Sequence, residues 1–118
     1  MSLFSSLLVG HLVGDYLLQT GWMAERKASH WWPLMAHAAV YTTVVTAAGL
    51  LAGGLSAGAI ALVLASHLVL DGTTFTAWWS RRVQSVTPSA KVWLPIVTDQ
   101  VFHLVALVLA VLLTRAPS

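Results

Sequence analysis

The chain has 118 residues, of which 58% are hydrophobic and only 8% are charged, whereas an ordinary soluble domain carries roughly 25% charged residues. Its mean hydropathy is +0.79, its formal net charge is +2, and it contains no cysteine. This composition predicts an integral membrane protein with one domain, residues 1–118, and it excludes disulfides, thiolate ligands and a basic stripe for binding nucleic acid.

Four apolar stretches are expected to cross a bilayer as helices, near residues 2–21, 34–52, 57–78 and 93–114. Each is long enough, because a helix rises about 1.5 Å per residue and the hydrocarbon core is about 30 Å thick. The first stretch contains Asp15 and lacks a basic flank, so we interpret it as a retained span and not as a cleaved signal. The predicted fold class is all-α, a four-helix transmembrane bundle.

The connections between these stretches differ in charge. Residues 22–33 and 79–92 hold five of the six Lys and Arg residues, while the link at Gly53-Gly54 is short and uncharged. This bias predicts that both basic loops are cytoplasmic and that the N- and C-termini lie outside. All six tryptophans flank the same two loops, as interfacial anchors do. The expected location is the inner (cytoplasmic) membrane, as a multi-pass protein surrounded by lipid.

Polar residues interrupt the apolar stretches at helical spacing. Residues i, i+4 and i+8 share one face of a helix, so His11, Asp15 and Gln19 are expected to form a polar stripe. A histidine and an aspartate four residues apart occur in three of the four stretches: His11 with Asp15, His67 with Asp71, and Asp99 with His103.

The reversed order in the last stretch matches its reversed direction through the membrane. Counted from the cytoplasmic end of each helix, the three aspartates lie roughly 5–8 residues in, and their histidines lie about one turn deeper. His37 enters from the second helix near the depth of the carboxylates. The spacing therefore predicts that seven ionisable groups converge on two adjacent layers of one bundle.

Such groups need compensation, because an aspartate at the centre of a membrane helix costs roughly 2.5–3.5 kcal/mol. Imidazoles and carboxylates together suit a divalent transition metal, with Zn the first choice and Fe or Mn as others, and the surplus of ligands fits one or two ions. Two other interpretations stay open: polar groups that only join the helices, and haem held by histidines on facing helices. The predicted metal ligands are His11, Asp15, His37, His67, Asp71, Asp99 and His103.

The same residues carry a family resemblance. His11-x-x-Gly14-Asp15-x-x-Leu18-Gln19, His37, His67-x-x-x-Asp71 and Asp99-Gln100-x-x-His103 resemble the pattern of the small bacterial membrane proteins grouped as domain of unknown function 3307. The resemblance covers nearly the whole chain and implies a four-helix membrane protein with a shared polar core. A looser similarity, in helical His and Asp content only, extends to bacterial proteins described as membrane-bound metal-dependent hydrolases.

The leading hypothesis is a metal-dependent hydrolase that opens towards the cytoplasmic leaflet and acts on a lipid-like or phosphoester substrate. Asp15 or Asp99 is expected to act as general base, and Gln19 or Gln100 to orient water or substrate. The alternatives are a divalent-metal or proton-coupled carrier, which four helices would form only as a homo-oligomer, and a structural subunit of a larger membrane complex. The sequence has no nucleophile-elbow serine, no Gly-rich phosphate loop and no His-Glu-x-x-His.

Overall fold

The computed structural model describes residues 2–26, 30–85 and 93–115, and within these ranges all regular secondary structure is helical. The all-α class is therefore confirmed. The segments are α1 (Leu3–Leu12), the π-helical η1 (Val13–Leu17), α2 (Gly21–Arg26), α3 (Trp31–Leu50), α4 (Ala57–Gly72), α5 (Phe75–Arg82) and α6 (Trp93–Arg115).

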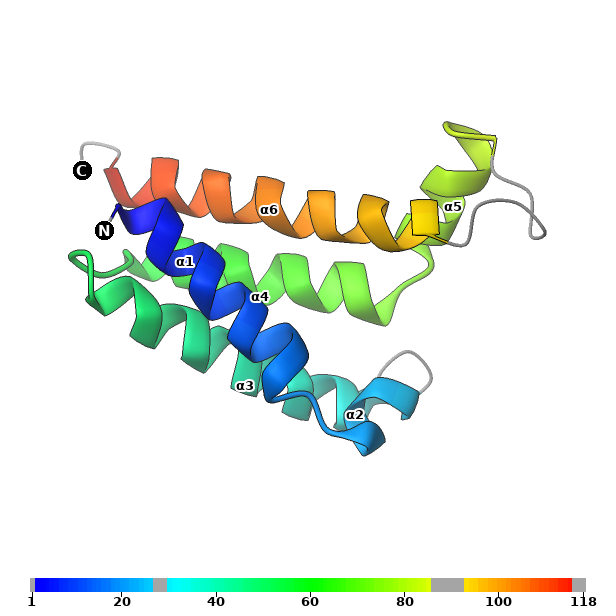
Figure 1. Cartoon of the computed structure of the whole chain (residues 1–118), viewed down its shortest axis with the longest axis horizontal. Coiled ribbons are helices and arrows are strands. Elements are labelled where there is room, and N and C mark those ends of the chain that lie inside the picture. The colour runs from blue at the N-terminus through cyan, green and yellow to red at the C-terminus, as the bar shows by residue number, and fades with distance from the viewer. Residues whose placement is uncertain (1, 27–29, 86–92, 116–118) are drawn as a thin grey trace.

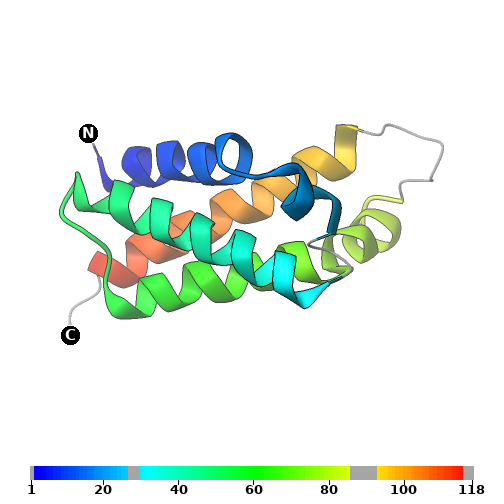
Figure 2. The same cartoon turned by 90° about the horizontal axis from the view of Figure 1, so that it is seen from below.

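The four longer helices lie side by side (Figures 1 and 2), with α1 and α4 each in contact with both α3 and α6. The start of α1, the end of α6 and the turn between α3 and α4 lie at one end of this bundle. Gly53 and Gly54 form that turn with φ of +108° and +89°, a backbone conformation that favours glycine. The short helices α2 and α5 lie at the opposite end.

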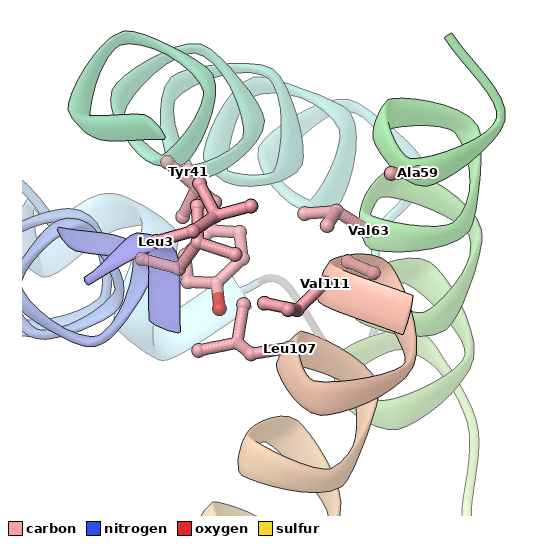
Figure 3. Close-up of a cluster of buried hydrophobic side chains, with 9 residues drawn as sticks. Leu3, Tyr41, Ala59, Val63, Leu107 and Val111 are labelled. Atoms are coloured by element: carbon pink, nitrogen blue, oxygen red, sulfur yellow. The ribbon is translucent and has the colours of Figure 1, made fainter. Parts of the chain in front are cut away.

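The half of the bundle near the α3–α4 turn is filled by apolar side chains from all four long helices (Figure 3). The buried cluster consists of Leu3, Leu7, Tyr41, Val45, Ala59, Val63, Leu107, Ala110 and Val111. Tyr41 closes this cluster on the side of α2 and α5, where the buried polar residues begin. The bundle thus has an apolar half and a polar half along its length.

The first predicted span ends at Leu17 and not at residue 21, which corrects the sequence-based boundary. Its last turn is the wider π turn, in which Leu18 N–H donates to the carbonyl oxygen of Val13 at 3.0 Å. Leu18 then leaves the helical conformation, with φ of −104° and ψ of 3°. The π turn also holds Asp15, and such turns are frequent at functional sites.

Gln19 consequently lies between two helices, and the predicted stripe ends at Asp15. The second helix starts at once because Thr20 caps it, its hydroxyl accepting the N–H of Met23 at 3.3 Å. Residues 22–33, predicted as a loop, therefore contain α2, and α3 begins at Trp31 with Pro33 tolerated in its first turn.

The third predicted span, 57–78, is broken after Gly72, and α5 leaves α4 at an angle of 65°. Thr73 explains the break, since its backbone is extended and its hydroxyl makes hydrogen bonds to the backbone of both flanking helices. That hydroxyl donates to the Val69 carbonyl in the last turn of α4 and accepts the first N–H of α5, from Phe75. The predicted loop 79–92 accordingly contains the end of α5, and its residues 86–92, like residues 27–29 of the first loop, lie outside the described ranges.

Two helices, Trp31–Leu50 and Leu94–Arg115, are long and apolar enough to cross a membrane, and α4 with α5 makes a third if the bent pair counts as one span. Leu3–Leu17 is apolar but only about 22 Å long, against a hydrocarbon core of about 30 Å. The structure thus provides two or three candidate spans where the sequence predicted four. Large apolar side chains are exposed along the helices, among them Val9, Leu12, Val101 and Leu112, which is compatible with a membrane protein.

Two glycines one turn apart bring α1 close to α3. A Cβ atom on Gly10 would lie 2.9 Å from the Cβ of Ala48 and 3.1 Å from the Cα of Val45, and one on Gly14 would lie 3.2 Å from the Cα of Tyr41. Gly-x-x-x-Gly is the spacing typical of membrane helices whose backbones pack closely. The close approach places His11 and Asp15, the residues that follow these glycines, against α3.

We expect Gly10→Ala to lower the free energy of unfolding by about 1–3 kcal/mol, because the added methyl overpacks the α1–α3 contact. Gly58→Ala is the matched control, since a Cβ there meets nothing within 4 Å. That substitution should be neutral or stabilise by about 0.4–1 kcal/mol. Unfolding in detergent micelles, followed by circular dichroism, measures both; equal stability of the two variants would contradict the close approach.

Candidate metal centre

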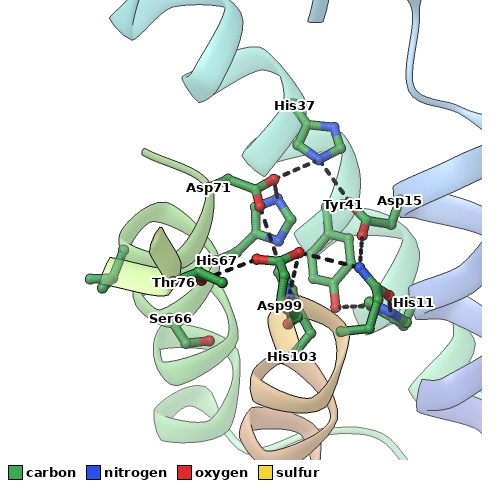
Figure 4. A network of polar contacts seen from close by, with 12 residues as sticks. His11, Asp15, His37, Tyr41, Ser66, His67, Asp71, Thr76, Asp99 and His103 are labelled. Atoms are coloured by element: carbon green, nitrogen blue, oxygen red, sulfur yellow. Dashed lines mark hydrogen bonds and ion pairs between the residues drawn. The ribbon is translucent and has the colours of Figure 1, made fainter. Parts of the chain in front are cut away.

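Four histidines and three aspartates meet in the polar half of the bundle, as Figure 4 shows. They come from α1, η1, α3, α4 and α6 and are His11, Asp15, His37, His67, Asp71, Asp99 and His103. All four imidazoles are no more than 2% exposed, whereas the Asp99 side chain is 28% exposed. The seven predicted ligands thus lie in one region, and Asp99 marks its opening to the outside.

The Asp71 carboxylate lies at the centre of this cluster. Its Oδ2 is 3.0 Å from Nε2 of His67 and 3.2 Å from Nε2 of His37, while its Oδ1 is 3.6 Å from Nε2 of His103. His37 Nε2 is also 3.1 Å from Oδ1 of Asp15. One carboxylate therefore joins three imidazoles from three helices.

The donor atoms form two groups that have the spacing of metal ligands. Each residue of a group offers one ligand atom, and these atoms all lie within 4.8 Å of one another. Ligands of a tetrahedral zinc, at about 2.0–2.1 Å from the ion, are about 3.3–3.4 Å apart, close to the distances around Asp71. The groups are Asp15, His37, His67 and Asp71, and then Asp71, Asp99 and His103; His11 is in neither.

His103 has the orientation of a metal-binding histidine. Its Nδ1 donates to the backbone carbonyl oxygen of Asp99 at 2.8 Å, which leaves the lone pair on Nε2. Metal ligands commonly fix their tautomer in this way. Nε2 is buried, faces Asp71 and has no hydrogen-bond partner among the described residues.

His67 faces the same carboxylate. Its Nε2 lies 3.0 Å from Oδ2 of Asp71, an ion-pair distance for a protonated ring nitrogen. A buried polar atom without a partner costs about 1–3 kcal/mol, so the unpartnered Nε2 of His103 calls for an explanation. A cation between the His103 imidazole and the Asp71 carboxylate would satisfy both groups.

His11 makes hydrogen bonds with both ring nitrogens. Its Nε2 is 2.8 Å from Oε1 of Gln100, an oxygen that only accepts, so Nε2 carries the proton and donates it. In the neutral ring, Nδ1 then accepts the hydroxyl proton of Tyr41 at 2.7 Å. The lone pair of His11 is therefore used by Tyr41.

Gln100 connects this pair to the carboxylates. Its amide nitrogen donates to Oδ2 of Asp15 and to Oδ2 of Asp99, both at 3.3 Å, and the two acceptors fix the direction of the amide. The hydroxyl of Thr76 donates to the other oxygen of Asp99 at 3.4 Å. Gln100 thus holds two of the three aspartates in place, whereas the predicted partner Gln19 lies beyond the helix end.

Two residues of the site were missed by sequence reasoning. Tyr41 donates to His11 and stacks on His67, with ring centroids 4.0 Å apart. It follows His37 by four residues, so the rule that revealed the His–Asp pairs also places it on the site's face of α3. No sequence pattern points to Thr76, because its contact depends on the bend between α4 and α5.

The family model described as "Protein of unknown function (DUF3307)" matches residues 3–117, which include every residue of the cluster. The chain belongs to this family. No curated protein and no solved structure matches the chain, and the looser similarity to metal-dependent hydrolases has no counterpart in these comparisons. The family description of this DUF3307 chain names no activity, so its function must be argued from the site.

We expect Tyr41→Phe to lower the free energy of unfolding by about 1–3 kcal/mol, because it leaves Nδ1 of His11 buried without a donor. Tyr16→Phe is the control, since Tyr16 is exposed. Unfolding in detergent gives the stability, and the ¹⁵N chemical shifts of labelled histidine report the His11 tautomer. Unchanged stability together with an unchanged tautomer would contradict the assigned hydrogen bond.

Proposed function

We propose that this chain is a membrane-embedded, metal-dependent hydrolase whose substrate is lipid-like or a phosphoester. The observation that carries the proposal is the buried group of imidazole and carboxylate atoms with ligand spacing, beside which the buried Nε2 atom of His103 has no hydrogen-bond partner among the described residues. Buried histidine and aspartate at this spacing suit a divalent transition metal, with Zn as first choice and Fe or Mn as others.

The ligands we propose are the six residues of the two groups: Asp15, His37, His67, Asp71, Asp99 and His103. His11 was predicted as a ligand, but its lone pair accepts from Tyr41, so we assign it a positioning role. Through Gln100 it orients the carboxylates of Asp15 and Asp99. Such supporting hydrogen bonds tune the affinity of metal sites.

Asp99 is our candidate for the residue that meets the substrate, since its side chain is 28% exposed and that of Asp71 only 5%. A bound divalent metal would lower the pKa of a water molecule and polarise the reacting oxygen. Asp99 would bind the metal through one carboxylate oxygen, its other oxygen would accept a proton from that water, and the amide of Gln100, 3.3 Å from Oδ2, would keep the carboxylate oriented.

The lipid-like character of the substrate is supported by an open apolar groove of about 320 Å³ between α4 and α6. Phe75 and Phe102 in its wall directly precede Thr76 and His103 in the sequence, so the groove lies beside the polar cluster. An acyl chain suits an apolar groove on helices that can cross a membrane. The exposed Arg81 at the end of α5 is suited to an anionic head group.

The carrier remains the alternative of a different class, but the apolar half of the bundle disfavours it. Leu7, Val45, Val63 and Leu107 are at most 2% exposed and lie between the cluster and the far end of the bundle. An ion crossing the membrane would need a polar path through this layer. A structural subunit in a larger complex or homo-oligomer would instead bind metal without hydrolysing any ester.

Purified protein is expected to contain a divalent transition metal, measured by elemental analysis, and His67→Ala should lose at least half of it. His30→Ala is the control, because that histidine is exposed at the start of α3 and belongs to neither group. A folded wild-type protein that remains metal-free after incubation with Zn²⁺, Fe²⁺ or Mn²⁺ would overturn the proposal.

Hydrolysis can be tested with p-nitrophenyl butyrate and bis(p-nitrophenyl) phosphate in detergent micelles. Asp99→Asn is expected to lower kcat by about 100-fold or more, the usual contribution of a group that takes up a proton. Glu25→Gln removes the acidic residue that lies outside the cluster, exposed on α2, and should leave the rate unchanged. Metal-loaded wild type that hydrolyses neither ester would favour the structural alternative.

A further inference from the structure

We infer that the centre holds two metal ions and that the Asp71 carboxylate bridges them. This inference rests on the proposed function and makes it more specific. The two groups of ligand atoms share Asp71 and no other residue. Carboxylate-bridged pairs of metal ions are a known solution in helical bundles, where ligands project inward from several helices.

The two oxygens of Asp71 face different partners, as a bridge requires. Oδ2 lies 3.0 Å from His67 Nε2 and 3.2 Å from His37 Nε2, both in the first group. Oδ1 lies 3.6 Å from Nε2 of His103, in the second group. Each oxygen of Asp71 is therefore placed to bind a separate ion together with the histidines on its own side.

The imidazole nitrogens provide further support. His67 Nε2 in the first group lies 3.0 Å from Oδ2 of Asp71, whereas His103 Nε2 in the second lies 3.6 Å from Oδ1 and has no hydrogen-bond partner among the described residues. The two nitrogens thus approach the carboxylate from opposite oxygens. A cation on the Oδ1 side, in addition to the one held by the first group, would satisfy His103 Nε2.

The two positions differ in their number of ligands. Four residues form the first group, which completes a tetrahedral site, and three form the second, which leaves a position for water or substrate. The second group also contains Asp99, the most exposed of the three aspartates. We therefore assign the reaction to the metal ion of the second group. The ion of the first group, with its four ligands, would stay bound beside it.

The charge of a two-ion centre also selects the substrate. Two divalent ions outweigh the three carboxylates by one positive charge, whereas a single ion would leave the centre negative and repel an anion. Paired ions about 3.5–4 Å apart stabilise the attacking and leaving oxygens in phosphoryl transfer. Of the two kinds of ester used in the test above, the charge of a two-ion centre thus favours the phosphoester over the carboxylic ester.

The test is a titration of the metal-free full-length protein in detergent with Mn²⁺, followed by elemental analysis and electron paramagnetic resonance. Wild type should bind two ions per chain, and the six-line signal of the first should give way to a spin-coupled spectrum when the second binds. His103→Ala should bind one ion and keep the six-line signal. Glu25→Gln should behave as wild type, and loaded wild type should accelerate the hydrolysis of bis(p-nitrophenyl) phosphate over its uncatalysed rate by a factor at least ten times larger than for p-nitrophenyl butyrate.

The outcomes separate this inference from the proposed function. Binding of no ion by folded wild type overturns both. One ion per chain at saturation overturns the bridge but leaves a metal-dependent hydrolase standing. Two bound ions whose spectra show no spin coupling would also overturn the bridge. This measurement is made on wild-type protein, so its result does not depend on whether a variant folds.

Discussion

The strictest constraint on this fold is that three carboxylates and four imidazoles are buried together among apolar helices. Burying each such group costs several kcal/mol unless neighbouring groups compensate its charge or polarity. Removing one group would therefore leave its partners uncompensated. Asp71 provides most of this compensation, because its two oxygens face imidazoles from α3, α4 and α6. The packing of three helices therefore depends on one carboxylate.

Two irregular parts of the helices each bring a residue to this cluster. The π turn contains Asp15, which lies opposite His37. The break after Gly72 turns the direction of the chain, so that Thr76 on α5 lies within hydrogen-bond distance of Asp99. A continuous α4 would carry Thr76 straight on along its axis. Departures from regular geometry at positions beside polar groups are typical of functional sites.

Much of the site follows from spacing alone. Residues four apart share a helix face, and alternating helix directions bring the His–Asp pairs to one depth, which is why seven predicted residues lie together. Spacing cannot decide what each nitrogen binds. The two hydrogen bonds of His11 depend on how α1 is rotated against α3 and α6, and neither Tyr41 nor Gln100 was paired with it in the sequence.

Helix boundaries were predicted less well, for a local reason. Hydropathy continues through Leu17 and Leu18, and the apolar Phe75, Ala77 and Trp78 follow Gly72 closely enough to be taken into one predicted span. Thr20 starts α2, and Thr73 both ends α4 and starts α5, through hydroxyls that bond backbone groups. Threonine also occurs inside helices, so its capping role emerges only from the backbone conformation.

The glycine at position 14 has a consequence for mutational scanning. A Cβ there would lie 3.2 Å from both the Cα and a ring carbon of Tyr41, the residue that holds His11 and stacks on His67. A mutational scan of the site would therefore rank Gly14 with the cluster residues, although it has no side chain to contribute. At Gly14 every replacement should be harmful, whereas at the cluster positions the effect should depend on the chemistry of the new side chain.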